Sequence, residues 1–134
     1  KGDDSTYNQL KPMAMRLGAA FQKINFLRDL NADYIGMGRA YFPGVDIESF
    51  DHESKKRIEE SIASDFHEGF LGIRQLPKGA KFGVYVAYLY YLALFKKIKN
   101  TAPEYVLKER IRIRNRQKFS ILFFSYLKYQ FNLI

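Results

Sequence analysis

The sequence predicts an all-α protein made of a row of helices. Apolar residues recur at helical spacing in four long segments. Pro, Gly or potential capping residues separate these segments, and no segment is convincing as part of a sheet. The 134 residues, 47% of them hydrophobic, are enough for one domain around one core. We therefore expect a single helical domain.

The first long helix is predicted to begin near Pro12, because proline suits the first turn of a helix. The polar stretch before it, Lys1–Tyr7, is expected to hold at most a short helix of its own. The long helix should end between Asp33 and Gly38, since Gly36 and Gly38 interrupt the pattern there.

Two further helices are predicted in the middle of the chain. The first spans about His52–Gln75, with Asp51 as its N-cap and Pro77 shortly beyond its end. The second spans about Ala80–Asn100 and is apolar on nearly all sides, so it should be central in the fold.

The last part of the chain contains a short helical turn after Pro103, a basic segment at Lys108–Lys118 and a final helix at about Gln117–Phe131. In the basic segment, four arginines alternate with apolar or polar residues. A strand would place these arginines on one side and a helix would scatter them, so the pattern leaves both conformations open.

Composition excludes several classes of site. The absence of Cys rules out disulfides and thiolate metal sites, and the two histidines, His52 and His67, lack a second ligand at a recognised spacing. The longest apolar run, Phe82–Phe95, has 14 residues, whereas a membrane-spanning helix needs ~20. A net charge of +8 favours an anionic partner: nucleic acid, a membrane surface or a polyphosphate substrate.

The candidate functional segment is Gln22–Asp33. Helical spacing would place Gln22, Asn25, Asp29 and Asp33 within an arc of roughly 80°. Two carboxylates four residues apart can share Mg²⁺, which prefers oxygen ligands. Both acids also fall near the C-terminal end of the predicted helix, where the helix dipole disfavours anions. The alternative is that they are ordinary surface acids.

This segment resembles a known motif. The pattern Gln22-x-x-Asn25-x-x-Arg28-Asp29-x-x-x-Asp33, followed by Gly38-Arg39-x-Tyr41-Phe42-Pro43, is similar to the second aspartate-rich motif of the squalene and phytoene synthases. The resemblance continues through Tyr91 and Arg110 to the C-terminal helix. It implies an isoprenoid-synthase-like helical bundle, Mg²⁺ as cofactor and polyprenyl diphosphates as substrates.

The resemblance also implies roles for individual residues. It implies diphosphate binding by Gln22, Asn25, Arg28 and Arg110, metal binding by Asp29, Asp33 and Asn25, and catalytic roles for Asp29, Asp33 and Tyr91. Two alternatives stay open. Tyr91 could be one of many core rings, and Arg112, two residues along, could take the place of Arg110.

Two departures from the family pattern affect the interpretation. Family members often have Glu-Asp at the end of the motif, where this chain has Ala32-Asp33. The family's first aspartate-rich helix has no counterpart here. We therefore expect residues 1–134 to be the C-terminal portion of a single synthase domain, inactive alone, with the missing N-terminal half or another copy of the chain as its partner.

The expected reaction of the intact enzyme joins two geranylgeranyl diphosphates to phytoene through a cyclopropyl diphosphate, in carotenoid biosynthesis. Squalene- or dehydrosqualene-type synthesis and a non-catalytic interaction module are the alternatives. Nucleic-acid binding is disfavoured because it leaves the Gln22–Asp33 pattern unexplained. The lipid substrates imply a cytoplasmic protein that contacts a membrane surface.

Overall fold

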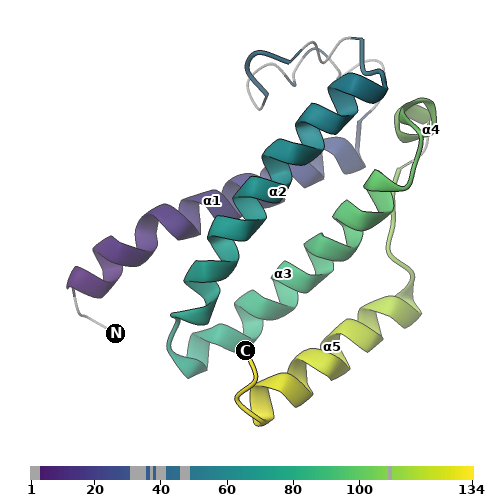
Figure 1. Ribbon diagram of the computed structural model, residues 1–134. Helices are drawn as coiled ribbons and strands as arrows, with labels where there is room; N and C mark the ends of the chain where they lie inside the picture. Colours follow the sequence, from purple (N-terminus) through teal and green to yellow (C-terminus); the bar gives the residue numbers. More distant parts are fainter. Residues whose placement is uncertain (1–3, 31–35, 37, 39–41, 46–48, 109) are drawn as a thin grey trace.

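The computed structural model describes residues 4–30, 36, 38, 42–45, 49–108 and 110–134 (Figure 1). These residues form five α-helices and no strand, which confirms the predicted all-α class. The helices are α1 (Asp4–Arg28), α2 (His52–Arg74), α3 (Lys78–Lys99), α4 (Pro103–Lys108) and α5 (Asn115–Gln130).

Helix α3 is central, as its apolar sequence predicts. It packs against α1, α2 and α5. In Figure 1, α2, α3 and α5 lie side by side with alternating directions, and α1 crosses behind α2. The largest fully buried apolar side chains come from α1, α2, α3 and α4: Ile24, Leu27, Ile58, Ile62, Ile73, Leu94, Ile98 and Val106. Within the described residues, no helix has both the length and the hydropathy needed to cross a bilayer.

Two glycines of α2 allow α1 to approach closely. A Cβ added at Gly69 would lie 2.8 Å from the Cβ of Leu17, and one added at Gly72 would lie 2.7 Å from the Cβ of Met13. Any larger side chain at either position would therefore separate the two helices or displace α1 side chains.

A buried acid ties the same two helices together. Asp65 on α2 is 5% exposed, and its carboxylate accepts from Arg16 Nε and from Lys23 Nζ, each at 2.7 Å. Lys23 also donates to Ser61 Oγ at 2.8 Å. If α1 moved away from α2, the Asp65 carboxylate would be buried without its cationic partners, which is strongly destabilising. These contacts therefore fix how α1 lies on α2.

The first helix differs from its prediction at both ends. It begins at Asp4, so Pro12 lies inside the helix rather than in its first turn. It ends at Arg28, before the predicted end between Asp33 and Gly38. The backbone oxygen of Arg28 accepts from the N–H of Ile111 at 3.4 Å, which gives this terminal carbonyl a partner outside the helix.

The later elements agree closely with prediction. Asp51 caps α2 as expected, its side chain accepting from the N–H of Ser54 at 2.8 Å. Helix α3 starts two residues before the predicted Ala80, directly after Pro77. The predicted turn after Pro103 is α4, and α5 begins two residues before the predicted start.

Residues 110–114 of the basic segment, whose conformation the sequence left open, are neither helix nor strand, and Arg114 has extended backbone angles; we call these residues the extended segment. Ile111 and Ile113 are buried there, and Arg110, Arg112 and Arg114 are exposed. The alternation seen in the sequence thus separates the arginines from the core as a strand would, although the described residues include no partner strand.

Candidate functional site

The site lies where the C-terminal end of α1 meets α3 and the extended segment before α5. Helix α1 supplies Asn25 and Arg28, and Asp29 follows immediately after the helix. The middle of α3 supplies Tyr91. Arg110 comes from the extended segment, whose Ile111 is hydrogen-bonded to the end of α1. The fold therefore brings together three segments that are far apart in the sequence.

Tyr91 is oriented toward the predicted motif. Its hydroxyl donates to Asn25 Oδ1 at 3.0 Å. Its ring stacks on Phe21 of α1, with centroids 4.2 Å apart and an interplanar angle of 18°. The stacked ring and the hydrogen bond together hold the Tyr91 hydroxyl beside Asn25.

Asp29 is held by two arginines. Its Oδ1 lies 2.9 Å from Arg110 Nε, and its Oδ2 lies 3.1 Å from Arg28 Nη2. The hydrogen bond to the Asp29 carboxylate raises the pKa of Arg28 above its usual value. Asp29 and Arg110 are each about half exposed, so this cluster is open to an incoming ligand.

A basic pocket of about 220 Å³ adjoins the cluster. It is lined by Arg28, Tyr90, Arg110, Ile111, Arg112, Ile113, Asn115 and Lys118. Four of these side chains are cationic and none is acidic. Ligand pockets for drug-sized molecules run roughly 300–1,000 Å³, so this pocket suits a small anionic group better than a prenyl chain.

Sequence reasoning missed part of this pocket. The sequence pattern assigns no site role to Tyr90 or Lys118, which both line the pocket, with Lys118 Nζ 6.0 Å from the centre of the Tyr90 ring. Arg112 lines the same pocket as Arg110, so the two alternatives for the arginine position share one site. The signal available in the sequence was the Arg-Ile alternation itself.

Of the remaining predicted residues, the structure describes Gln22 but not Asp33. Gln22 is exposed on α1, a turn before Asn25. Asp33 lies outside the described residues, so the predicted Asp29–Asp33 pair stays a prediction. Helix α1 ends at Arg28, so Gln22 and Asn25 lie on the helix and Asp29 follows in a turn, where its N–H still donates to the Asn25 carbonyl at 3.2 Å as it would in a helix.

The site contains carboxylate and amide oxygens, which are the types of ligand that Mg²⁺ prefers. Asp29 supplies a carboxylate and Asn25 an amide oxygen with a second lone pair besides the one that accepts from Tyr91. Mg²⁺ is typically held by one or two carboxylates together with substrate phosphates and water. Among the described residues, no group of three or more His, Cys, Asp or Glu side chains lies together, and the predicted ligand Asp33 is not one of these residues.

Comparison with models of protein families gives a match, described as squalene/phytoene synthase, over residues 2–117. The matched region includes α1 to α4 and the extended segment and ends within the first turn of α5. No curated protein and no solved structure matches the chain.

Proposed function

This chain belongs to the squalene/phytoene synthase family, and we propose that it binds the diphosphate group of a polyprenyl substrate for head-to-head coupling. The family comprises prenyltransferases of isoprenoid biosynthesis with an isoprenoid-synthase-like all-α fold. We infer phytoene formation from two geranylgeranyl diphosphates as the reaction of the intact enzyme. Squalene- or dehydrosqualene-type synthesis is the alternative within the family.

The proposal depends on one observation. Arg28 and Arg110 both form ion pairs with Asp29, beside a pocket that has no acidic lining residue. Guanidinium groups present planar pairs of donors that match phosphate oxygens. A diphosphate in this pocket would be within reach of cations from α1 and from the extended segment. The non-catalytic module, the alternative from outside the enzyme class, has no need of this arrangement.

An exchange of partners would link diphosphate binding to the metal. Without ligand, the Asp29 carboxylate pairs with both arginines and offsets one of their two positive charges. An incoming diphosphate carries more negative charge than the carboxylate and would accept the hydrogen bonds of Arg28 and Arg110. The Asp29 oxygens would then be available to the metal. Mg²⁺ held there by Asp29 and Asn25 would neutralise charge on the diphosphate as the allylic carbon–oxygen bond breaks.

The remaining side chains would orient the Asn25 amide and stabilise the departing diphosphate. Tyr91 donates to Asn25 Oδ1, so the Asn25 amide hydrogens are directed away from Tyr91 and can donate to diphosphate oxygens. The negative charge that develops on the departing diphosphate would be stabilised by Arg28, Arg110 and Lys118, cations already positioned before the reaction.

The test is titration of a non-hydrolysable polyprenyl diphosphate analogue by calorimetry, with and without Mg²⁺. Arg110→Gln removes a charged hydrogen bond and should weaken binding by about ten- to a hundredfold. Arg74→Gln, an exposed arginine at the end of α2, is the matched control and should bind as the unchanged chain does.

Asp29→Asn distinguishes diphosphate binding by the arginines from metal binding by Asp29. Without Mg²⁺ it should bind the analogue at least as tightly, because the carboxylate that competes for the arginines is gone. With Mg²⁺ it should lose the gain in affinity that the unchanged chain shows. Equal binding by the unchanged chain and the Arg110→Gln chain would refute the diphosphate site and favour the non-catalytic module.

A further inference from the structure

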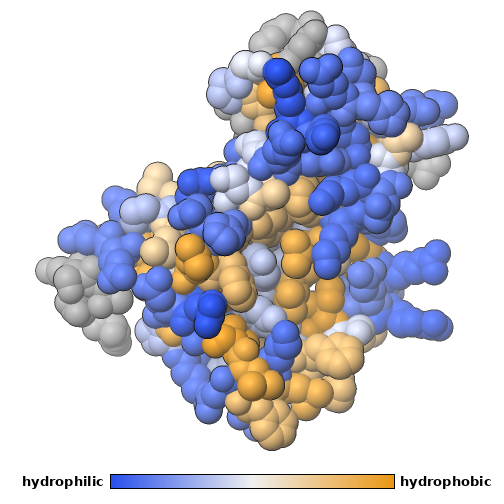
Figure 2. Space-filling view, viewed as in Figure 1, coloured by the Kyte–Doolittle hydropathy of each residue, from blue (hydrophilic) through white to orange (hydrophobic). Residues whose placement is uncertain are grey.

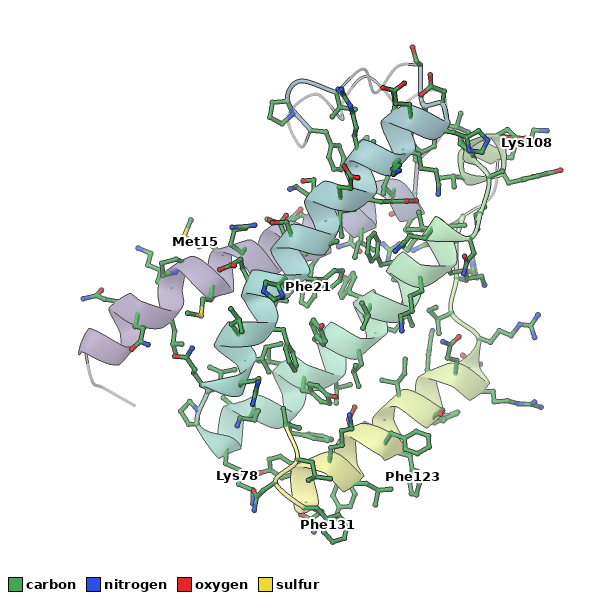
Figure 3. All side chains as sticks on the ribbon, viewed as in Figure 1. Met15, Phe21, Lys78, Lys108, Phe123 and Phe131 are labelled. Carbon is green, nitrogen blue, oxygen red and sulfur yellow. The ribbon has the colours of Figure 1, made fainter. Side chains whose placement is uncertain are left out.

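The extended segment carries two of the four cations of the basic pocket, Arg110 and Arg112. In Figure 3 it leaves α4 just after the labelled Lys108 and runs past the end of α3 to α5. Figure 2 shows hydrophilic side chains projecting at this edge of the molecule. Because residues 110–114 are neither helix nor strand, contacts other than a regular ladder of backbone hydrogen bonds must fix where these cations lie.

The side-chain pattern of the extended segment does not define its register. Residues 110–114 alternate Arg and Ile, and side-chain directions in extended backbone alternate with the same period of two. A shift by two residues would move Ile113 into the buried position of Ile111. The same shift would move Arg112 into the place of Arg110. Burial of isoleucine and exposure of arginine therefore cannot choose between the two registers.

Two backbone groups of the segment have contacts that do define the register. The N–H of Ile111 donates to the Arg28 carbonyl at 3.4 Å, which is long for a hydrogen bond. The carbonyl of Arg112 accepts from Lys97 Nζ of α3. A hydrogen bond from a charged donor is the stronger of the two kinds. Lys97 is therefore placed to hold the segment in the observed register.

Lys97 is itself well fixed. It lies in the last turn of α3, and its own carbonyl accepts from Thr101 Oγ1 at 2.7 Å. The next residue, Ile98, is fully buried, so the helix backbone cannot move at this point without disturbing the core. The Lys97 side chain thus reaches the segment from a rigid base.

The start of α5 could supply the extra length that a shifted register needs. The side chain of Arg114 forms no capping hydrogen bond with the described residues, and the first turn contains Arg116 but no acidic residue. The helix dipole disfavours a cation at this end. The first turn of α5 can therefore unwind by two residues more easily than a capped turn could.

We propose that Lys97 is a positioning residue for the diphosphate site, because it fixes the register of the extended segment and so selects Arg110 rather than Arg112 as the partner of Asp29. This inference rests on the proposed function. Lys97 is not among the residues that line the basic pocket, so it acts through the Arg112 carbonyl. Without it, both registers would form, and either arginine could lie opposite Asp29.

The first test is a double-mutant cycle between Lys97 and Arg110, measured by calorimetric titration of the polyprenyl diphosphate analogue without Mg²⁺. In the unchanged chain, Arg110→Gln should weaken binding about ten- to a hundredfold. Lys97→Met alone should weaken binding only about threefold, since an arginine still occupies the position. In the Lys97→Met chain, Arg110→Gln should weaken binding no more than about fivefold, because the shifted register supplies Arg112.

Two further variants distinguish positioning from a loss of charge. Lys97→Arg keeps a charged donor and should restore the full effect of Arg110→Gln. Lys96→Met is the matched control, because Lys96 is the exposed residue before Lys97 and does not line the basic pocket. It removes the same charge from the same turn, and the effect of Arg110→Gln should stay as large as in the unchanged chain.

The second test needs no ligand. Amide hydrogen exchange followed by NMR should show Ile111 protected in the unchanged chain by its hydrogen bond to the Arg28 carbonyl. In the Lys97→Met chain, protection at Ile111 should fall and protection at Ile113 should rise, because the Ile113 N–H takes the same position in the shifted register. Lys96→Met should leave the protection at Ile111 unchanged.

The outcomes separate this inference from the proposed function. If Arg110→Gln does not weaken binding in the unchanged chain, the diphosphate site is refuted, and hydrogen exchange alone decides whether Lys97 sets the register. If Arg110→Gln does weaken binding, an equal effect in the Lys97→Met chain would overturn the inference. Unchanged protection at Ile111 in the Lys97→Met chain would also overturn it, as would an equal loss of protection in the Lys96→Met chain.

Discussion

Replacing Gly69 by Ala should destabilise the protein, although alanine is the better helix former. The new Cβ would lie 2.8 Å from Leu17 Cβ and 3.1 Å from Leu17 Cα, whereas ordinary van der Waals contact begins near 3.4 Å. Because the backbone of α1 is itself too close, a new rotamer of Leu17 cannot relieve the clash. Overpacking costs about 1–3 kcal/mol, and the helix propensity of Ala returns up to about 1 kcal/mol. The net loss should be about 1 kcal/mol.

Gly18→Ala in α1 and Gly83→Ala in α3 are the controls. A Cβ at either position meets no atom within 4 Å, so these variants should be more stable by about 0.5–1 kcal/mol. The assay is urea unfolding followed by circular dichroism, from which the free energies of unfolding are compared. If Gly69→Ala is as stable as Gly83→Ala, then the close approach of α1 to α2 is not as described, and the reasoning fails.

Three further predictions follow from single contacts. Asp65→Asn leaves two cations without their carboxylate and should lower the free energy of unfolding by about 2 kcal/mol or more in urea titration; an unchanged value would contradict the buried ion pairs. Tyr91→Phe keeps the ring stack but loses the hydrogen bond to Asn25, and should cost about 1 kcal/mol by the same assay. The N–H of Ser54 lowers the pKa of Asp51, so its capping contribution is present above about pH 4 and is lost as the pH falls through the lowered pKa. Asp51→Asn caps without titrating, so its thermal midpoint should fall less on acidification; equal slopes would argue against this cap.

Much of the fold follows from local sequence signals. Asp51 and Pro77 mark the start of α2 and the boundary before α3 because caps and prolines act within one helical turn. The all-round apolar composition of α3 predicts its central position. The end of α1 was not predictable in this way, because the partner of the Arg28 carbonyl is Ile111, a residue brought near only by the folded chain.

The candidate site likewise has features that the local sequence predicts and features that depend on the folded chain. Asn25, Arg28 and Asp29 were found from one short stretch, because they lie within it. The pairing of Tyr91 with Asn25 and of Arg110 with Asp29 depends on how α3 and the extended segment pack on α1. No local pattern marks Lys118, because its place in the pocket wall beside Tyr90 depends on how the chain folds.

The hydrogen bond between the Arg28 carbonyl and the Ile111 N–H has a consequence for the order of folding. It closes a loop that contains α2, α3 and α4, and forming such a loop costs chain entropy before any contact compensates. The basic pocket can therefore be complete only once the helices between its two halves have packed. Amide hydrogen exchange at Ile111 should accordingly report whether the pocket is assembled, and ligand binding there should slow the opening of the whole loop.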